Sequence, residues 1–286
     1  MKKLLILAIA LFFSLSNGFA QGMSGDTWAS TKANKAGKIT ITYTHAPKFA
    51  EVVYGQRKGL CFDIMYEFVS YVSIKYGVNL SIDYKNISDV KDFDLFLKTV
   101  KVSKGGVFGL GDVTITSARK KVYNFGAPYF SNVAILATSN NVSVLSSMEN
   151  ISKEFAGKTI IIQNGTTHES RANALKKKMP SLVIEKTTGF NEANQKVAQN
   201  DTYFTYIDFS TYLDVVTKRV PLKRHEVGDQ KGEDFGFIMP KNSDWAPVFN
   251  EFMAADGGFI KSVTYRKMLA DNLGSHVLKL MNAITK

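Results

Sequence analysis

GDVTITSARKKVYNFGAPYF, residues 111–130, is the stretch that decides the fold of this 286-residue chain. It begins with the strand-like, hydroxyl-rich run 113–116, places Arg119 in a turn or at a helix start, and ends on aromatic residues around Pro128. Arginine binds a carboxylate through two parallel charge-assisted hydrogen bonds. Taken alone, the stretch fits an amphipathic strand with a solvated basic turn equally well, so the rest of the chain must separate the two interpretations.

The N-terminus has the pattern of a secretory signal peptide. Lys2 and Lys3 precede the apolar run 4–13, and residues 14–20 form a polar region with Gly18 and Ala20 at the positions expected before cleavage. The apolar run is too short for a membrane anchor. A lipid anchor is not expected either, because no cysteine stands at the cleavage point. We therefore predict cleavage near Ala20 and export to the periplasm.

Composition limits what the exported chain can be. Roughly 265 residues remain after cleavage, and at about 100–200 residues per domain this length favours two lobes over one. The single cysteine, Cys61, excludes an intrachain disulfide. The formal net charge of +11 becomes +9 without Lys2 and Lys3, which favours anionic ligands or surfaces. Its lysines are scattered without an aromatic–basic module, so we expect no nucleic-acid partner.

Nothing in the sequence indicates catalysis or a cofactor. The four histidines lack metal-ligand spacing, so we expect surface or capping roles and no metal site for His45, His168, His225 and His276. No serine, cysteine or histidine has the context of an activated nucleophile. We therefore predict that the protein is not an enzyme, that it needs no cofactor, and that it is a monomer.

Strands and helices alternate along the chain, which predicts βαβ units and largely parallel sheets. Residues 21–36 are polar and small, and are interpreted as a flexible leader. Strands are expected over residues 38–44, 78–84, 107–116, 133–138, 159–163, 183–186, 203–207 and 235–240. Helices are expected over 59–76, 93–100, 152–155, 168–178, 192–199, 209–218, 245–253, 258–269 and 275–283, the last three returning to cover the first half.

Three predicted strands end on groups that suit a ligand. Ligands of open α/β sheets bind at the carboxyl ends of strands. The first such end supplies Thr114 and Arg119, the second supplies the turn 165–167 (Gly-Thr-Thr) at a helix start, and the third supplies Asp208. Free N–H groups at a helix start favour an anion. Each feature alone is more often a helix cap, but together they describe a site for a carboxylate beside an ammonium.

At this point the chain resembles the bacterial extracellular solute-binding proteins of family 3, the polar amino-acid type related to the ligand cores of ionotropic glutamate receptors. The stretch 111–130 is similar to that family's signature, a hydroxyl-rich strand followed by T-x-x-R and a PYY-like end. GLCFDIMYEFVSYV, FAGKTIIIQNGTTHES, YIDFSTYLDVV, FGFIMPKNS and FNEFMAADGGFIKSVTYRKML are similar to other segments of the family. The resemblance covers nearly the whole chain after the signal peptide.

The resemblance implies an α/β, two-lobed periplasmic-binding-protein (Venus flytrap) fold with mostly parallel sheets flanked by helices. Residues 37–131 plus 235–286 would form lobe 1 and residues 132–234 lobe 2, with hinge crossovers near 131–134 and 232–235. The implied function is to capture an amino acid or analogue between the lobes and deliver it to an inner-membrane ABC permease. The alternatives are a periplasmic sensory module and a cyclohexadienyl-dehydratase-like enzyme on the same scaffold.

The resemblance also implies roles for single residues. Arg119 would bind the ligand carboxylate, helped by Thr166 and the backbone N–H of Thr167. Thr114, the backbone carbonyl of Asp112 and the carboxylate of Asp208 would bind the ammonium group. The wall that selects the ligand side chain would come from Tyr43, Thr44, His45 and Phe49, with Tyr54 as a further candidate, and the sequence does not choose among them. Asp112 stands where the family usually has a small residue, which adds a carboxylate to the cleft.

Overall fold

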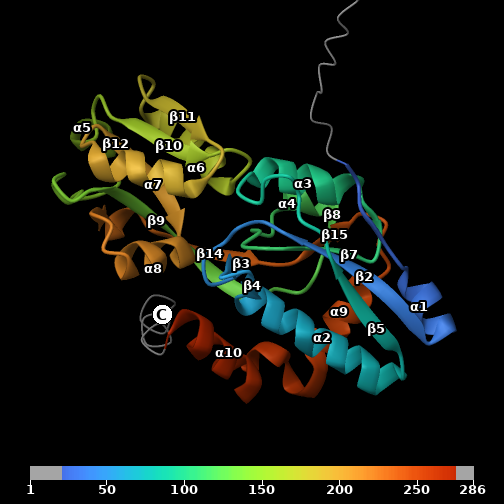
Figure 1. Ribbon diagram of the computed structural model, residues 1–286. Coiled ribbons are helices and arrows are strands. Elements are labelled where there is room, and N and C mark those ends of the chain that lie inside the picture. The colour runs from blue at the N-terminus through green and yellow to red at the C-terminus, as the bar shows by residue number, and fades with distance from the viewer. Residues whose placement is uncertain (1–20, 275–286) are drawn as a thin grey trace, which may run out of the picture.

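The computed structural model describes residues 21–274 and shows two lobes, each a β-sheet with helices on its faces (Figure 1). The signal peptide expected at 1–20 and the helix expected at 275–283 lie outside the described residues. The first lobe contains the N-terminal elements together with the last helices of the chain, and the second lobe contains the middle of the chain. The two-lobed α/β fold predicted from the sequence is therefore confirmed.

The first lobe is built on a five-stranded sheet in the order β5-β2-β7-β15-β8. The strands β2, β5 and β7 are parallel, whereas β15 runs antiparallel to its neighbours. Strand β2 buries Ile39 and Ile41, and α2 covers the sheet with Phe62 and Phe68. The elements are β2 (Ala36–Tyr43), a hairpin of β3 (Glu51–Val53) and β4 (Gln56–Lys58), α2 (Leu60–Tyr76), β5 (Asn79–Tyr84), α3 (Phe93–Val102), β7 (Val107–Leu110), α4 (Ser117–Lys120), β8 (Tyr123–Phe125) and β15 (Ile238–Pro240).

The second lobe has a six-stranded sheet in the order β11-β10-β12-β9-β13, with β14 also paired to β9. The strands β11, β10 and β12 are parallel, and β9 runs antiparallel to β12, β13 and β14. The elements are β9 (Phe130–Ser139), α5 (Ile151–Glu154), β10 (Thr159–Gln163), α6 (Thr167–Lys178), β11 (Val183–Thr187), α7 (Phe190–Gln199), β12 (Tyr203–Asp208), α8 (Phe209–Thr217), β13 (Leu222–Arg224), the 3-10 turn Glu226–Gly228 and β14 (Gln230–Phe235).

Two antiparallel strands carry the chain between the lobes. Strand β9 leaves the first lobe and β14 returns to it, and they pair from Phe130 with Phe235 to Ala134 with Gln230. The return leads into α9 (Ala246–Ala254) and, after short 3-10 turns at Ala255–Gly257 and Phe259–Lys261, into α10 (Val263–Leu273). Helix α10 packs on α2, so the last described helix covers the first lobe as expected. The hinge role of the two crossovers remains a prediction.

The segment expected to be a flexible leader instead folds onto the first lobe. It contains β1 (Ser24–Gly25), which pairs with β6 (Lys104–Gly105), and the helix α1 (Trp28–Asn34). The Trp28 ring packs 4.8 Å from that of Tyr76 and 5.2 Å from that of Trp245. The polar composition suggested a leader, but one tryptophan and a capped helix start are enough to attach the segment.

The strand expected over 107–116 ends early. Strand β7 stops at Leu110, and Gly111 then takes a φ of +146°, which favours glycine and turns the chain away from the sheet. Thr114 keeps a single bridge to Phe235. The Thr116 side chain accepts a hydrogen bond from the Arg119 backbone N–H at 3.1 Å and caps α4. The departure from the sheet takes the 112–119 segment to the cleft.

Candidate functional site

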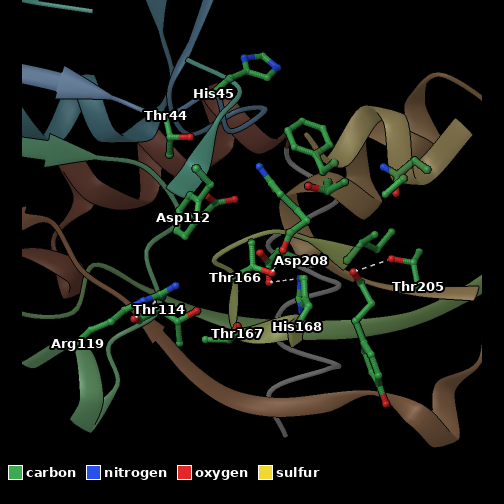
Figure 2. Close-up of a pocket in the computed structure, with 18 residues that line it drawn as sticks. Thr44, His45, Asp112, Thr114, Arg119, Thr166, Thr167, His168, Thr205 and Asp208 are labelled. Atoms are coloured by element: carbon green, nitrogen blue, oxygen red, sulfur yellow. Dashed lines mark hydrogen bonds and ion pairs between the residues drawn. The ribbon is translucent and has the colours of Figure 1, made fainter. Parts of the chain in front are cut away.

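A pocket of about 30 Å³, small enough to hold only a few water molecules, lies between the lobes. All six residues predicted to bind the ligand line it, and Figure 2 shows them with their neighbours. The first lobe contributes Thr44, His45, Phe93, Asp112, Thr114 and Arg119. The second contributes Gln163, Thr166, Thr167, His168, Phe190, Ala193, Asn194, Thr205, Tyr206, Ile207, Asp208 and Thr211. The structure thus brings the predicted residues together, while their roles in binding remain predictions.

Arg119 is a partly buried cation without a carboxylate partner among residues 21–274. Its Nη1 donates to the Thr114 carbonyl at 2.9 Å, and its Nη2 donates across the cleft to the Gly165 carbonyl at 3.0 Å. The guanidinium also lies 5.3 Å from the centre of the Phe93 ring. Burial lowers the pKa of Arg119, which reflects the cost of a charge held away from water. An anion in the pocket would offset that cost.

The start of α6 faces Arg119 from the second lobe. Gly165 takes a φ of +76° and lets β10 turn directly into the helix. The Thr166 hydroxyl donates back to the Gln163 carbonyl at 2.8 Å and makes no capping bond to the helix. Thr167 is the first residue of α6, so its backbone N–H has no acceptor within the helix. This N–H and the helix dipole add to the positive potential around Arg119.

Asp208 ends β12 and forms the acidic side of the pocket. Its Oδ1 accepts a hydrogen bond from Asn132 at 2.6 Å and lies 3.6 Å from Nε2 of His168. Burial raises the pKa of Asp208, but His168, Arg171 and Asn132 together hold it below its usual value. Asp208 is therefore ionised at neutral pH and can face a cation.

His168 and Arg171 form a buried network that the sequence analysis missed. Arg171 is 8 % exposed, donates to Thr167 Oγ1 at 3.0 Å and to Gln230 at 2.9 Å, and pairs with Glu233. Its Nη1 also lies 2.8 Å from His168 Nδ1. The signal was present as histidine and arginine three residues apart, on one face of a predicted helix. Because Gln230 and Glu233 lie on β14, the network joins the ligand-side helix to a crossover strand.

The expectation of surface or capping roles is wrong for two histidines. His168 is 5 % exposed and His225 is fully buried. His225 Nδ1 accepts from the Leu145 backbone N–H at 2.9 Å, and its Nε2 lies 2.7 Å from Thr138 Oγ1. Burial, followed by the nearby Lys223 and Lys158, lowers the pKa of His225 to about 4, so the ring is neutral. The His225 ring is held by residues distant in the sequence, whereas the His168 ring contacts Arg171 on its own helix and Asp208 on β12. His276 lies outside the described residues.

Asp112 projects into the same pocket from the first lobe (Figure 2). Its side chain makes no hydrogen bond or ion pair to another residue within 21–274. Burial, followed by repulsion from Asp208, raises the pKa of Asp112 to about 7. The two lobes thus bring two carboxylates into one pocket, one ionised and one close to its titration midpoint at neutral pH.

Only part of the predicted specificity wall reaches the pocket. Thr44 and His45 line it, and the His45 ring stacks on Phe190 of the second lobe with centroids 5.6 Å apart. Tyr43 and Phe49 do not line it, and their assignment to the wall was wrong: both are buried in the hydrophobic core, where Tyr43 packs on Phe62 and Phe49 on Phe130. Tyr54 is 99 % exposed, on the β3–β4 hairpin. Tyr43 is the last residue of β2 and packs into the core, whereas Thr44 and His45 follow the strand end and reach the pocket.

Comparison with known proteins identifies the fold. No protein-family model and no curated protein matches the chain. An arginine-, lysine- and histidine-binding protein, ArtJ of Geobacillus stearothermophilus, aligns with a TM-score of 0.65 at 20% identity over 83% of this chain and 96% of its own. A substrate-binding protein of an ABC uptake transporter from Streptococcus pneumoniae, with bound histidine, aligns with a TM-score of 0.67 at 20% identity over 87% of this chain and 97% of its own.

An ancestral arginine-binding protein bound to arginine aligns with a TM-score of 0.64 at 23% identity, over 83% of this chain and 98% of its own. These likenesses show that the chain has the two-lobed fold of periplasmic binding proteins. Among residues 21–274, no helix is long and apolar enough to cross a membrane. The same residues hold no group of three or more metal-ligating side chains.

Proposed function

We propose that this chain, with its two-lobed binding-protein fold, is an exported solute-binding protein that captures an amino acid or close analogue and delivers it to an ABC-type importer. The observation that carries the proposal is that Arg119, a partly buried cation without a carboxylate partner in the described chain, and Asp208 line one pocket. A zwitterionic head group has the matching pair of charges. The pocket as it stands holds only a few water molecules, so the lobes must open to admit an amino acid.

The chemistry of each side of the pocket supports a division of roles. Arg119 has five N–H donors, and its two bonds to carbonyls leave others for a ligand carboxylate beside the Thr167 N–H. Thr166 lies in the same turn and helps to shape that anion site. Asp208, the Thr114 hydroxyl and the Asp112 carbonyl form the ammonium side. Thr114 is only 4 % exposed and its hydroxyl makes no hydrogen bond within 21–274, so it is free to accept one.

Solved structures of similar fold support the ligand class and the partner. All three of those described above are named for arginine or histidine, and one of them belongs to an ABC uptake transporter. Export to the periplasm, action as a monomer and an inner-membrane permease partner are parts of the proposal.

Calorimetry with the mature protein and each of the twenty amino acids tests the binding step. We expect one amino acid or more to bind at one site, and Arg119→Ala to weaken it by about 2–5 kcal/mol, as for a buried charged partner that is removed. Lys120→Ala is the matched control, because Lys120 is the exposed neighbour of Arg119 and does not line the pocket. The proposal is wrong if no amino acid or analogue binds, or if both variants bind like the wild type.

Uptake of the labelled ligand tests delivery. Cells that lack this gene should import the ligand more slowly at low external concentration, and the wild-type gene should restore uptake while the Arg119→Ala gene should not. Equal uptake in all three strains would remove the transport role while leaving the binding role intact.

Asp112 supports a second candidate function, a cyclohexadienyl-dehydratase-like enzyme. A carboxyl group whose pKa is raised to about 7 is about half protonated at neutral pH, and its protonated form can act as a general acid. Conversion of prephenate or arogenate by the purified protein, and its loss in Asp112→Asn, would establish this function. Binding of these acids without turnover would exclude it.

A further inference from the structure

Asn194 is a buried amide that the fold does not use. It lies in the first half of α7, lines the pocket and is 5 % exposed. Its Oδ1 is buried without a hydrogen-bond partner, and its side chain makes no hydrogen bond to any residue within 21–274. Leaving a buried polar group unpaired is costly. A buried amide that lines a ligand pocket and has no hydrogen-bond partner in the protein can form that hydrogen bond with the ligand.

The surroundings of Asn194 describe a side-chain subsite. Phe190 lies one helical turn earlier on the same face of α7, and Ala193 leaves space beside it. Phe190 stacks on His45 across the cleft, so the subsite is closed by a ring from each lobe. Thr211, at the start of α8, adds a buried hydroxyl that makes no hydrogen bond within the described residues. The subsite is polar but made largely of small or planar groups.

The charged side chains that line the pocket, apart from Asp112, already have a partner or a place beside the ligand head group. Arg119 and Asp208 suit the ligand head group, His168 is held by Arg171 and Asp208, and Asp112 lies under the field of Asp208. Among the other lining residues only His45 can carry a charge, and burial lowers its pKa and favours its neutral form. An anionic ligand side chain beside α7 would be buried without a counter-ion, and a cationic one would have only the half-protonated Asp112, so either charge would be costly. An uncharged side chain that both donates and accepts hydrogen bonds avoids this cost.

We propose that Asn194 determines ligand specificity by pairing with a side-chain carboxamide, so that the preferred ligand is glutamine or asparagine. This inference rests on the proposed function. Two amides are self-complementary, since the oxygen of each accepts an N–H of the other, and the Asn194 amide can present either atom by rotating about its last bond.

Calorimetry with four ligands that share one head group tests the proposal. Methionine approximates the length of glutamine without the amide, glutamate replaces the amide by a charge, and arginine carries the opposite charge. Each is titrated into the wild type, Asn194→Leu and Asn191→Leu. Asn191 is an exposed residue of the same helix outside the pocket, which makes it the matched control.

We expect the wild type to bind glutamine most tightly of the four. Asn194→Leu should weaken glutamine by roughly tenfold or more and leave methionine unchanged or stronger, while Asn191→Leu should stay within about twofold for every ligand. Because the leucine replaces an unpaired buried amide, the ligand-free Asn194→Leu protein should melt no lower than the wild type. Together these results separate a ligand contact from a role in folding.

Three outcomes would overturn the inference. If glutamine loses no affinity in Asn194→Leu, or if methionine, glutamate or arginine binds the wild type more tightly than glutamine, the specificity assignment is wrong and the amino-acid-binding function stands. If Asn194→Leu lowers the melting temperature without changing affinity, the amide serves the fold. If none of the four binds and the remaining amino acids also fail, the proposed function falls together with this inference.

Discussion

At the scale of the residue, Asp112 and Asp208 show how one pocket gives two carboxylates different protonation states. Asp208 has Asn132 and His168 beside it, and they stabilise its charge. Asp112 has no partner among the described residues, so burial and the charge of Asp208 raise its pKa to about 7. Like charges in one buried site cannot both ionise freely, and the partnered one ionises first. A ligand ammonium placed between them would favour ionisation of Asp112.

Ligand affinity should therefore depend on pH through Asp112. Below about pH 7 the ligand must displace the Asp112 proton, so affinity should fall by up to about tenfold for each pH unit as the pH is lowered. Calorimetry between about pH 5.5 and about pH 8.5 measures this slope. In Asp112→Asn the slope should be largely lost, and an unchanged slope would show that Asp112 does not sense the ligand charge.

The raised pKa of Asp112 makes the ligand-free protein more stable at low pH, whereas it makes ligand binding weaker at low pH. Asp112 binds a proton more tightly when folded than when unfolded, so its contribution to stability is full below about pH 4 and is lost as the pH rises through about 7. Urea unfolding without ligand should show that the wild type loses stability relative to Asp112→Asn as the pH is raised from about 4 to about 8. Parallel curves would contradict the raised pKa.

At the scale of the element, α1 shows how a short N-terminal helix becomes part of a lobe. Its start is capped by Thr27, and the Trp28 and Ala29 backbone N–H groups donate to the Asp244 carboxylate at 2.8 and 3.0 Å. The Trp28 ring lies between Tyr76 at the end of α2 and Trp245 at the start of α9. The helix therefore joins three parts of the chain that are far apart in the sequence.

Trp28→Ala should lower the free energy of unfolding by about 2 kcal/mol, less than for a fully buried tryptophan because Trp28 is half-buried. Urea denaturation measures the loss, and ligand affinity should stay unchanged because α1 lies outside the pocket. Val263→Ala, at an exposed position at the start of α10, is the control. A loss no greater than that of the control would restore the interpretation of a leader that adds no stability.

A second element-scale prediction concerns His225, which joins the β13 edge of the second sheet to β9 and the following loop. Its neutral form is required because Nδ1 accepts a hydrogen bond, and burial lowers its pKa to about 4 from about 6.5. The folded state thus binds the proton more weakly, and stability is lost as the pH falls from about 6.5 to about 4, by up to about 3 kcal/mol.

Urea unfolding of the wild type and His225→Leu at several pH values measures the contribution of His225 to the pH dependence of stability. The variant should be less stable at neutral pH because Leu145 and Thr138 lose their partner, and the difference should shrink as the pH falls through this range. The contributions of other groups cancel in the comparison. A difference that stays constant with pH would contradict the neutral, buried ring.

At the scale of the whole molecule, contacts between the lobes close the pocket. Arg119 donates to Gly165, Gln163 Nε2 donates to the Lys91 carbonyl at 3.1 Å, and His45 stacks on Phe190. Each contact joins residues of different lobes, so opening the lobes breaks all three. The His45–Phe190 stack makes no use of the predicted head-group residues and can be removed separately.

His45→Ala should therefore speed ligand release about two- to tenfold, the range expected for loss of one aromatic pair, with little change in the association rate. Stopped-flow fluorescence measures both rates. Tyr54→Ala is the control, since Tyr54 is 99 % exposed and outside the pocket. An effect on association alone would show that the stack does not hold the closed form.

Much of the fold was predictable because its signals are local. The strand expected at 159–163 matches β10, and the helix that ends before Gly77 matches α2, since Gly77 takes the left-handed conformation that stops a helix. The predicted head-group residues also meet in one pocket, because parallel strands present their carboxyl ends at one edge. The early end of β7 was missed, because hydroxyl alternation continues past Gly111 even though the chain leaves the sheet.

The sequence by itself determined the order of elements, the two α/β halves and the residues at the strand ends, since these depend on neighbours along the chain. Only the tertiary structure decided that Tyr43 and Phe49 are core while His45 and Asn194 face the pocket. It also decided that Arg171 meets Glu233 and that Asn132 meets Asp208. These pairings join residues on different elements, so no local pattern encodes them, and they form only when packing brings the elements together.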